Sequence, residues 1–149
     1  MAHRVPRAGS LEDAIAGALL ADRPFVPADA VLVGVGWSTV ESERAARELG
    51  LDALDAPPDV ALGASCRLAD GPDGLVLVLL EPVTEGRLAR SLARLGEGPV
   101  VTWWDVPALD EAATTRLSDG PLGPAHLLRA PDDGRFRLLR SPRAATIPA

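Results

Sequence analysis

The order of secondary-structure elements predicted for the first half of the chain occurs again in the second half. In each half an apolar strand, at residues 31–37 or 99–106, is followed by a helix and then by a hairpin around an Asp/Gly-rich turn. The repeat is about 65–70 residues long, which is too long for a stacked solenoid. We therefore expect an α+β fold in which two β-α-β-β-β modules share one curved mixed sheet.

The other predicted elements follow from apolar periodicity and turn residues. Ser10 is the predicted start of an N-terminal helix that precedes the first module. Leu88, Leu92 and Leu95 share one side of a predicted crossover helix between the modules. The remaining predictions are a helix at 40–49, a weak strand near Ala53, strands at 61–69 and 75–80, the crossover helix at 85–95, a helix at 109–117, and strands at 125–130 and 135–140.

Composition restricts the class of protein. The chain has 149 residues, the length of one domain, and its 47% hydrophobic and 24% charged residues are typical of a folded globular protein. The net charge of −6 opposes a general nucleic-acid role, because phosphate binding needs a basic surface. The chain has no lysine, which excludes lysine-anchored pyridoxal phosphate, and we expect no cofactor.

The cysteine content and the N-terminus predict a cytoplasmic protein. The single cysteine, Cys66, cannot form an internal disulfide. Glu12 and Asp13 stand at the front of the Ala/Leu-rich N-terminal stretch, where a signal peptide needs an uninterrupted apolar run. No segment approaches the roughly 20 apolar residues that span a bilayer, so we expect no membrane association.

Four local motifs occur in a known order. Residues 32–37 (LVGVGW) are similar to an opening strand written HVGIAV, and residues 77–82 (LVLLEP) to a fourth strand written IELLEP. Residues 85–98 resemble a crossover helix that ends in GEG, and residues 131–134 (PDDG) resemble a DPDG turn before a last strand. Together the motifs resemble the vicinal-oxygen-chelate superfamily of glyoxalases, bleomycin-resistance proteins and methylmalonyl-CoA epimerases.

This resemblance implies the division of the chain. It spans about residues 31–142, and the alternative is another α+β domain with repeated hairpins, such as a ferredoxin-like one. The expected division is an N-terminal helical extension and linker at 1–30, module one at 31–82, the crossover helix at 83–99, module two at 100–142, and a tail at 143–149.

The resemblance also implies four metal-ligand positions, one on each of four strands of the concave sheet face. Carried over by position, they fall at Leu32, at Val78, at Val101, and at either Arg137 or Leu138. A divalent metal in this family is held by His, Gln or Glu, and none of these residues offers such a ligand. We therefore expect the fold without its metal.

An apolar cavity on the concave face is the predicted binding site. Side-chain alternation predicts that Leu32 and the glycines of the first strand share one face with Val78 and Leu80, and that Val101 and Trp103 lie on the matching face of the second module. Small-molecule pockets have mostly apolar walls with a few polar anchors, although core packing is the alternative role for Trp103. The predicted ligand-binding residues are Leu32, Gly34, Val78, Leu80, Val101, Trp103 and Arg137, and the further polar anchors are Arg67, Thr102, His126 and Arg129.

Three residues are candidate catalytic groups. His126 is a candidate general base, but one histidine cannot hold a catalytic metal. Glu81 is a possible carboxylate base, with a role in the turn as the alternative, and Arg137 can bind an anion or lie at a solvated edge. Cys66 is expected to be a buried, inert thiol.

Three functions are compatible with these predictions. The first is a metal-independent protein, expected as a homodimer, that sequesters a hydrophobic or aromatic small molecule. The second is a metal-free isomerase, epimerase or cyclase in the same pocket. The third is a non-catalytic scaffold whose pocket is filled by Leu32, Val78, Val101 and Trp103.

Overall fold

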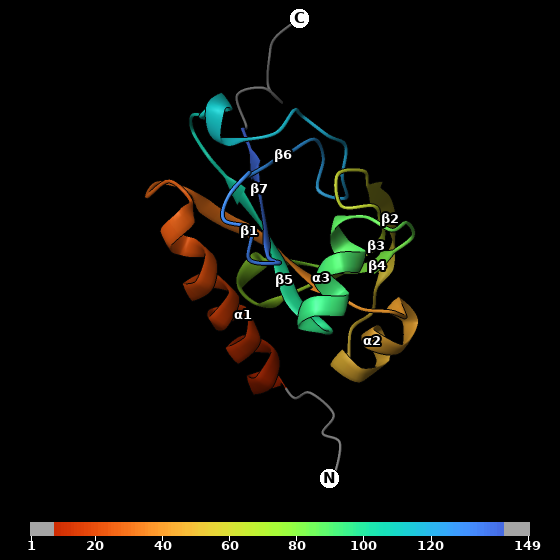
Figure 1. Cartoon of the computed structure of the whole chain (residues 1–149). Helices are drawn as coiled ribbons and strands as arrows, with labels where there is room; N and C mark the ends of the chain where they lie inside the picture. The colour runs from red at the N-terminus through yellow and green to blue at the C-terminus, as the bar shows by residue number, and fades with distance from the viewer. Residues whose placement is uncertain (1–7, 142–149) are drawn as a thin grey trace, which may run out of the picture.

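The computed structural model describes residues 8–141. Within them, seven strands form one mixed sheet in the order β2-β3-β4-β1-β5-β7-β6 (Figure 1). The strands are β1 (Val31–Ser38), β2 (Leu54–Asp59), β3 (Ala64–Asp70), β4 (Val76–Pro82), β5 (Gly98–Asp105), β6 (His126–Leu127) and β7 (Phe136–Arg140). The helices are α1 (Ala8–Asp22), α2 (Ser42–Leu49) and α3 (Arg87–Leu95), with 3-10 turns η1 (Arg23–Phe25), η2 (Pro72–Gly74) and η3 (Glu111–Ala113).

The first strands of the two halves lie side by side at the centre of the sheet. β1 pairs with β5 antiparallel, with β4 parallel on its other side, and β5 pairs with β7 parallel. The two halves therefore repeat the same parallel pairing around one central junction. This arrangement confirms the predicted α+β fold with a curled mixed sheet and an N-terminal helix.

One face of the sheet, which we call the helix face, is covered by α1 and α2. Ile15 and Ala18 lie three residues apart on α1, and this spacing turns both toward Val35 and Leu77 of the sheet. The small residues of α2 pack on Leu79 in the same way. Because β side chains alternate, the neighbours of these sheet residues point to the opposite face.

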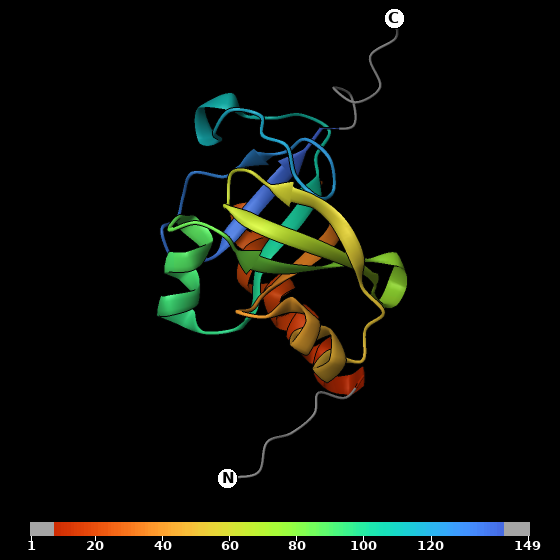
Figure 2. The same ribbon diagram turned by 90° about the vertical axis from the view of Figure 1, so that its right-hand side faces the viewer.

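That opposite face, the inner face, is covered by α3 and by the loops after β2 and before β6. Leu88 of α3 and Leu62 of the loop after β2 pack on Val78 and Trp103. Figure 2 shows α3 standing apart from α1 and α2. The inner face therefore has a cover made from parts of both halves of the chain.

A bulge in β1 changes which of its residues share a face. Leu32 pairs with Trp104, but Gly34 pairs with Trp103, so Val33 is an extra residue between them. Leu32 consequently packs on the helix face, whereas Val33 packs on the inner face. The prediction that Leu32 and Gly34 share a face is therefore wrong.

The second half departs most from the predicted repeat. Residues 109–117 are not a helix: only η3 forms, and the Asp110 side chain accepts from the Ala112 amide at its start. Thr114 and Ser118 then form bridges with Leu128 and Ala125, so this segment extends the sheet beyond β6. Backbone pairing with the edge strand replaces the helical hydrogen bonds that the apolar spacing predicted.

Other boundaries differ in smaller ways. β6 is only two residues long. β2 runs from Leu54 to Asp59 at the edge of the sheet. Proline has no amide hydrogen to donate, and an edge strand tolerates Pro57 and Pro58 because one of its sides has no neighbouring strand. Ser10 lies inside α1, which already includes Ala8, so it does not cap the described helix. No helix within residues 8–141 is long and apolar enough to cross a bilayer.

Candidate functional site

The centre of the inner face is filled by the protein's own side chains. Val78, Leu80, Val101 and Trp103 are all fully buried. Leu122 from the loop before β6 lies directly over the first strand: a Cβ added at Gly34 would be 2.7 Å from its Cδ1. Within residues 8–141, core side chains therefore occupy the place where the sequestration function predicted an open apolar cavity.

The two glycines of β1 make this close packing possible. A Cβ at Gly36 would stand 2.5 Å from Leu80 Cδ1, 2.8 Å from Val101 Cβ and 2.9 Å from Trp103 Cζ3. Side chains of neighbouring strands thus occupy the space that a β1 side chain would take. The two glycines therefore allow core side chains to pack directly on the β1 backbone, and they do not leave an open space for a ligand.

The residues to which the resemblance assigns metal-ligand positions on the inner face are apolar in the structure. Val78 and Val101 lie on the inner face, and the register places Leu138, not Arg137, on that face at the last strand. Leu32 has moved to the helix face because of the bulge. In the part of the chain that the structure describes, no group of three or more His, Cys, Asp or Glu side chains is placed to hold a metal.

The paired tryptophans point to opposite faces, as predicted from strand alternation. Trp103 packs on the inner face and Trp104 on the helix face. Trp104 Nε1 donates to Thr102 Oγ1 at 2.8 Å, whereas Trp103 Nε1 is buried and has no protein partner. Thr102 is also on the helix face, so it is not an anchor in an inner-face pocket.

Arg137, predicted to bind ligand, is instead buried in an ion-pair network on the helix face. Its Nε donates to Asp22 Oδ1 at 3.0 Å, and its two terminal nitrogens donate to Asp133 at 3.1 and 2.8 Å. The guanidinium also lies over the Phe25 ring, 4.7 Å from the centroid. Because Arg137 faces away from the inner face and its donors are used, the predicted ligand-binding placement is wrong.

The remaining candidate catalytic residues do not meet one another either. Glu81 Oε1 accepts from the Ser42 amide at 2.9 Å at the start of α2, which is a structural role in fixing that helix. His126 lies on β6, at the other end of the sheet, with Nδ1 2.8 Å from the Thr115 carbonyl oxygen. Since Arg137 is buried elsewhere, the three residues form no common catalytic group.

Two buried titratable groups lie beneath the loop after β2. Asp59 Oδ1 accepts from the Leu62 amide at 2.9 Å, but Oδ2 is buried without a partner beside Gly120. Burial raises the pKa of Asp59 from 3.8 to about 6, against the lowering effect of its backbone donors. Burial also raises the pKa of Cys66 to about 12, with a further contribution from the Asp59 charge. The thiol therefore remains protonated, in agreement with the inert role expected for it.

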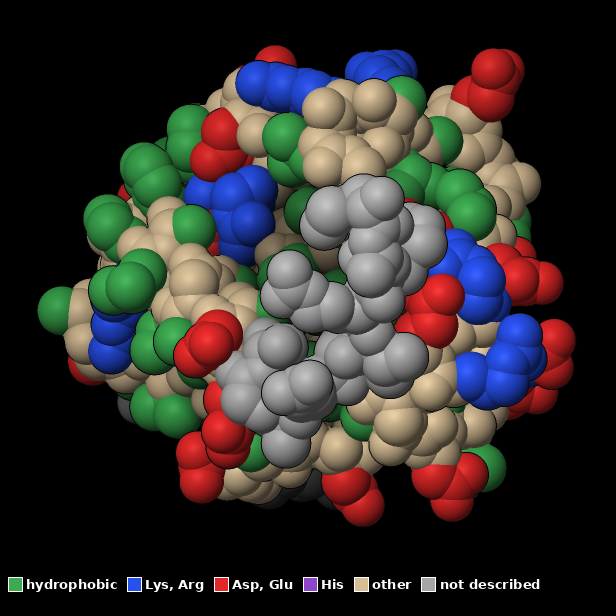
Figure 3. Space-filling model, turned by 90° about the horizontal axis from the view of Figure 1, so that it is seen from below, with side chains coloured by type: hydrophobic (Ala, Val, Ile, Leu, Met, Phe, Trp, Pro, Cys, Tyr) green, Lys and Arg blue, Asp and Glu red, His purple; other side chains and the backbone are tan. Residues whose placement is uncertain are grey.

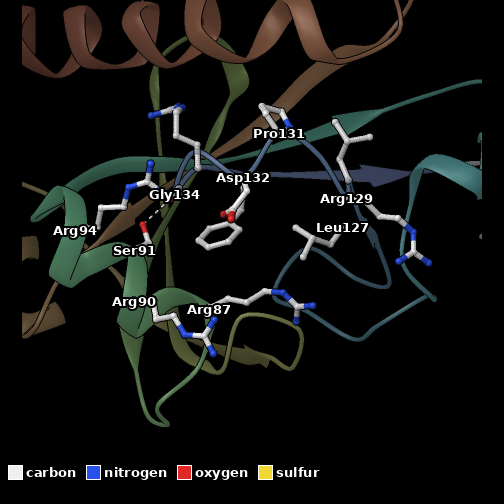
Figure 4. Close-up of a pocket in the computed structure, with 12 residues that line it drawn as sticks. Arg87, Arg90, Ser91, Arg94, Leu127, Arg129, Pro131, Asp132 and Gly134 are labelled. Carbon is white, nitrogen blue, oxygen red and sulfur yellow. Dashed lines mark hydrogen bonds between the residues drawn. The ribbon is translucent and has the colours of Figure 1, made fainter.

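An open hollow remains at the β7 end of the inner face, between α3 and the loop that precedes β7. We call it the α3 hollow; its volume is about 360 Å³. Leu127 and Phe136, both packed against the inner-face core, contribute its apolar surface. Figure 4 shows the side chains of α3 along one wall, with Leu127, Arg129 and Pro131 on the opposite side. The hollow is therefore the part of the inner face that the core leaves unfilled.

Arginines form most of the charged lining of the α3 hollow. Arg87, Arg90 and Arg94 lie at positions i, i+3 and i+7 of α3, so they share one side of that helix. Arg129, from the segment after β6, also lines the hollow, on the side opposite α3 (Figure 4). Among the described residues none of these four arginines has a carboxylate within 4.0 Å, and the one acidic side chain in the lining is that of Asp132.

Arginines elsewhere are mostly paired with acids. Arg44 contacts Glu41, Glu48 and Glu97, and Arg67 contacts Glu43 and Asp55. On the face shown in Figure 3, arginine side chains likewise lie beside acidic ones. Unpaired arginines concentrated in one hollow are unusual in a chain with net charge −6.

Sequence reasoning found only one of these four arginines. The sequence predicts Arg129 as a polar anchor. For the crossover helix it predicts only the apolar side formed by the leucines and gives no role to the arginines. The missed signal was the regular spacing of Arg87, Arg90 and Arg94 opposite the leucines. Arg135 also lines the hollow, but its guanidinium is held by Asp22 at 2.9 and 3.1 Å.

Comparison with solved structures identifies the fold, while no family model and no curated protein matches the chain. A methylmalonyl-CoA epimerase variant from Streptomyces coelicolor, in complex with 2-nitronate-propionyl-CoA, aligns with a TM-score of 0.58 at 19% identity, covering 74% of this chain and 95% of the epimerase. The Mycobacterium tuberculosis methylmalonyl-CoA epimerase aligns with a TM-score of 0.58 at 19% identity, covering 78% and 91%. A hypothetical protein from Bacillus halodurans aligns with a TM-score of 0.59 at 17% identity, covering 76% and 94%. The chain therefore has the vicinal-oxygen-chelate fold of the glyoxalases and epimerases.

Proposed function

We propose that this chain is a metal-independent protein that binds a small organic anion carrying an apolar group in the α3 hollow. The observation that carries the proposal is the set of four arginines without carboxylate partners above the Leu127 and Phe136 side chains. Guanidinium groups bind carboxylates and phosphates through paired hydrogen bonds, and the apolar surface suits the rest of such a ligand.

The size and position of the hollow agree with this proposal. Its volume of about 360 Å³ is within the range of small-molecule pockets. The Streptomyces epimerase of the same fold binds an anionic CoA derivative, 2-nitronate-propionyl-CoA. The proposal includes no reaction, because His126, Glu81 and Arg137 lie in three separate places. The homodimer, the cytoplasmic location and the domain limits remain predictions.

Calorimetric titration with 2-naphthoate tests the proposal, with neutral 2-naphthol as the matched control ligand. We expect one naphthoate site per chain whose affinity falls as salt rises, and weaker binding of naphthol. In the double variant R90A/R94A the naphthoate affinity should fall by about tenfold, since exposed charge pairs contribute up to about 1 kcal/mol each.

The arginine variant R47A is the control protein for this experiment. Arg47 is exposed on α2 and does not line the α3 hollow, so its loss changes the net charge but not the site. Equal affinity for naphthoate and naphthol, or an equal loss in R47A and R90A/R94A, would contradict the proposal.

A second candidate function is a scaffold that binds no small molecule. The specific observation in its favour is the filled centre of the inner face, where Trp103 and Leu80 are fully buried under Leu62 and Leu122. The same titration separates the two functions, because a scaffold predicts no saturable binding of either ligand.

A further inference from the structure

A second basic hollow adjoins the first and shares an arginine with it. This β6 hollow is lined by Glu111, Thr114, Thr115, Arg116, Leu117, His126 and Arg129, and its volume is about 470 Å³. Arg129 lines both hollows, so its side chain stands at the boundary between them. The two sites are therefore neighbours along one surface rather than separate patches.

The unpaired cations of the molecule gather on this surface. Seven arginines in the described residues have no carboxylate within 4.0 Å, and five of them line the two hollows. The other two are Arg23, which donates to the Ala30 carbonyl and lies over Trp104, and Arg47. Of the five, Arg87 donates from Nη1 to the Ala61 carbonyl oxygen at 3.1 Å. None of the five forms an ion pair within the described residues, although the chain has 21 acidic residues.

His126 adds a directed polar group to the β6 hollow. The carbonyl oxygen of Thr115 accepts from Nδ1 at 2.8 Å, which leaves Nε2 without a protein partner in the described residues. Arg116 lies on the segment 114–118, whose backbone pairs with residues 125–128, and Arg129 follows His126 at the end of that second segment. The only carboxylate in this lining is that of Glu111.

We propose that the two hollows form one extended site for an elongated small molecule with an anionic group at each end. One anion would lie among Arg87, Arg90 and Arg94, the other beside Arg116 and His126, with Arg129 between them. The inference rests on the proposed function, since the first anion occupies the α3 hollow. Both hollows have small-molecule dimensions, which favours such a ligand over an acidic protein segment.

Linking two weak anion contacts in one ligand has a measurable consequence. Once one end is bound, the other end is held at high effective concentration near its own site, provided that the connecting chain spans the distance. A dianion of suitable length should therefore bind more tightly than a monoanion of the same length. Ligands that are too short to span should lose this advantage.

The experiment compares unbranched α,ω-dicarboxylates of increasing chain length with monocarboxylates of the same length, by calorimetric titration of the full chain. We expect dicarboxylate affinity to rise to a maximum at one length, there exceeding the matched monocarboxylate by about tenfold. The variant R116A should remove this advantage while leaving monocarboxylate affinity unchanged. R129A should weaken both classes, and R47A should weaken neither.

The outcomes distinguish this inference from the proposed function. Monocarboxylates that bind as tightly as dicarboxylates at every length would overturn the extended site but leave the α3 hollow as an anion site. An equal effect of R116A on both classes would overturn it as well. Failure of monocarboxylates to bind would overturn the proposed function and the inference together. A preference for an acidic peptide over every dicarboxylate would overturn the small-molecule assignment.

Discussion

At the scale of single residues, several side chains predicted to be functional have structural roles. Glu81 fixes the start of α2, and Arg137 is enclosed by two carboxylates. Neither role can be recognised in the sequence, because each depends on a partner far along the chain, Ser42 and Asp22 respectively. A charged residue on a strand is therefore ambiguous until its partner is known.

Asp59 gives a prediction at this scale, since its buried Oδ2 has no partner. The pKa of Asp59 is raised to about 6, so between about pH 4 and 6 the folded chain binds a proton that the unfolded chain has released. The free energy of unfolding should therefore fall as the pH rises through this interval and stay low above it. The total effect is about 3 kcal/mol, from 1.4 kcal/mol per pH unit.

The variant Asp59→Asn should lose this pH dependence and should be more stable than the wild type above pH 7. Urea unfolding between pH 4 and 8 measures the difference. Asp119→Asn is the matched control, because Asp119 is exposed and its backbone carbonyl accepts from the Val60 amide beside Asp59. A wild-type pH dependence in the Asp59 variant would show that this carboxyl group is not the cause.

At the scale of elements, α1 is attached to the sheet by a fully buried carboxylate at its last residue. Asp22 binds Arg135 and Arg137, and it also accepts from Thr102 Oγ1 at 2.8 Å. A carboxylate at a helix C-terminus is unfavourable for the helix dipole, so these partners determine its position. Because Arg135 also lines the α3 hollow, the N-terminal helix supports the wall of the candidate site.

Replacement of Asp22 by Asn should therefore destabilise the fold strongly. The change leaves Arg137 buried on the helix face without its Asp22 carboxylate, and breaking such a pair costs about 3–5 kcal/mol. Asp13→Asn changes an exposed acid on the same helix and should alter stability by less than about 0.5 kcal/mol. Denaturant unfolding of the two variants measures the contrast, and equal effects would refute the role assigned to Asp22.

The elements also show how far sequence patterns determine this fold. The strands at 31–38, 76–82 and 98–105 were predicted within about two residues, because long apolar runs with β-branched residues have few alternatives. The prediction of a helix at 109–117 was wrong. The helical pattern there is short and weak, and the segment forms backbone bridges with the chain around β6 instead. The bulge at Val33 was missed, since a single extra residue leaves the apolar pattern intact while reversing the face of Leu32.

At the scale of the whole molecule, the chain has the vicinal-oxygen-chelate fold, and its own side chains fill the centre of the inner face. The hollows of the candidate site lie at the edge of that face, where α3 and the chain on either side of β6 meet. The sequence predicted the fold but not the hollows at this edge. A hollow depends on how well distant side chains pack, and no local pattern contains that information.

Metal content tests the whole-molecule interpretation. Protein purified without a histidine tag or chelators should contain far less than one Ni, Co, Mn or Zn per chain by elemental analysis. The physical reason is that Val78, Val101 and Leu138 offer no oxygen, nitrogen or thiolate ligand on the inner face. About one metal ion per chain, removed by chelator with a loss of stability, would contradict it.

The two glycines of β1 limit which substitutions the inner face can accept one at a time. Gly34 and Gly36 lie beneath Leu122 and Trp103, so the space above them is shared by side chains from three segments. Enlarging one of these residues requires another to shrink, and the positions are expected to change together in related chains. A variant with a metal ligand in place of Val78 or Val101 would also need a smaller side chain in place of Leu122 or Trp103. Introducing a metal site here would therefore require several coordinated substitutions, whereas the exposed arginines at the edge of the inner face can be replaced one at a time.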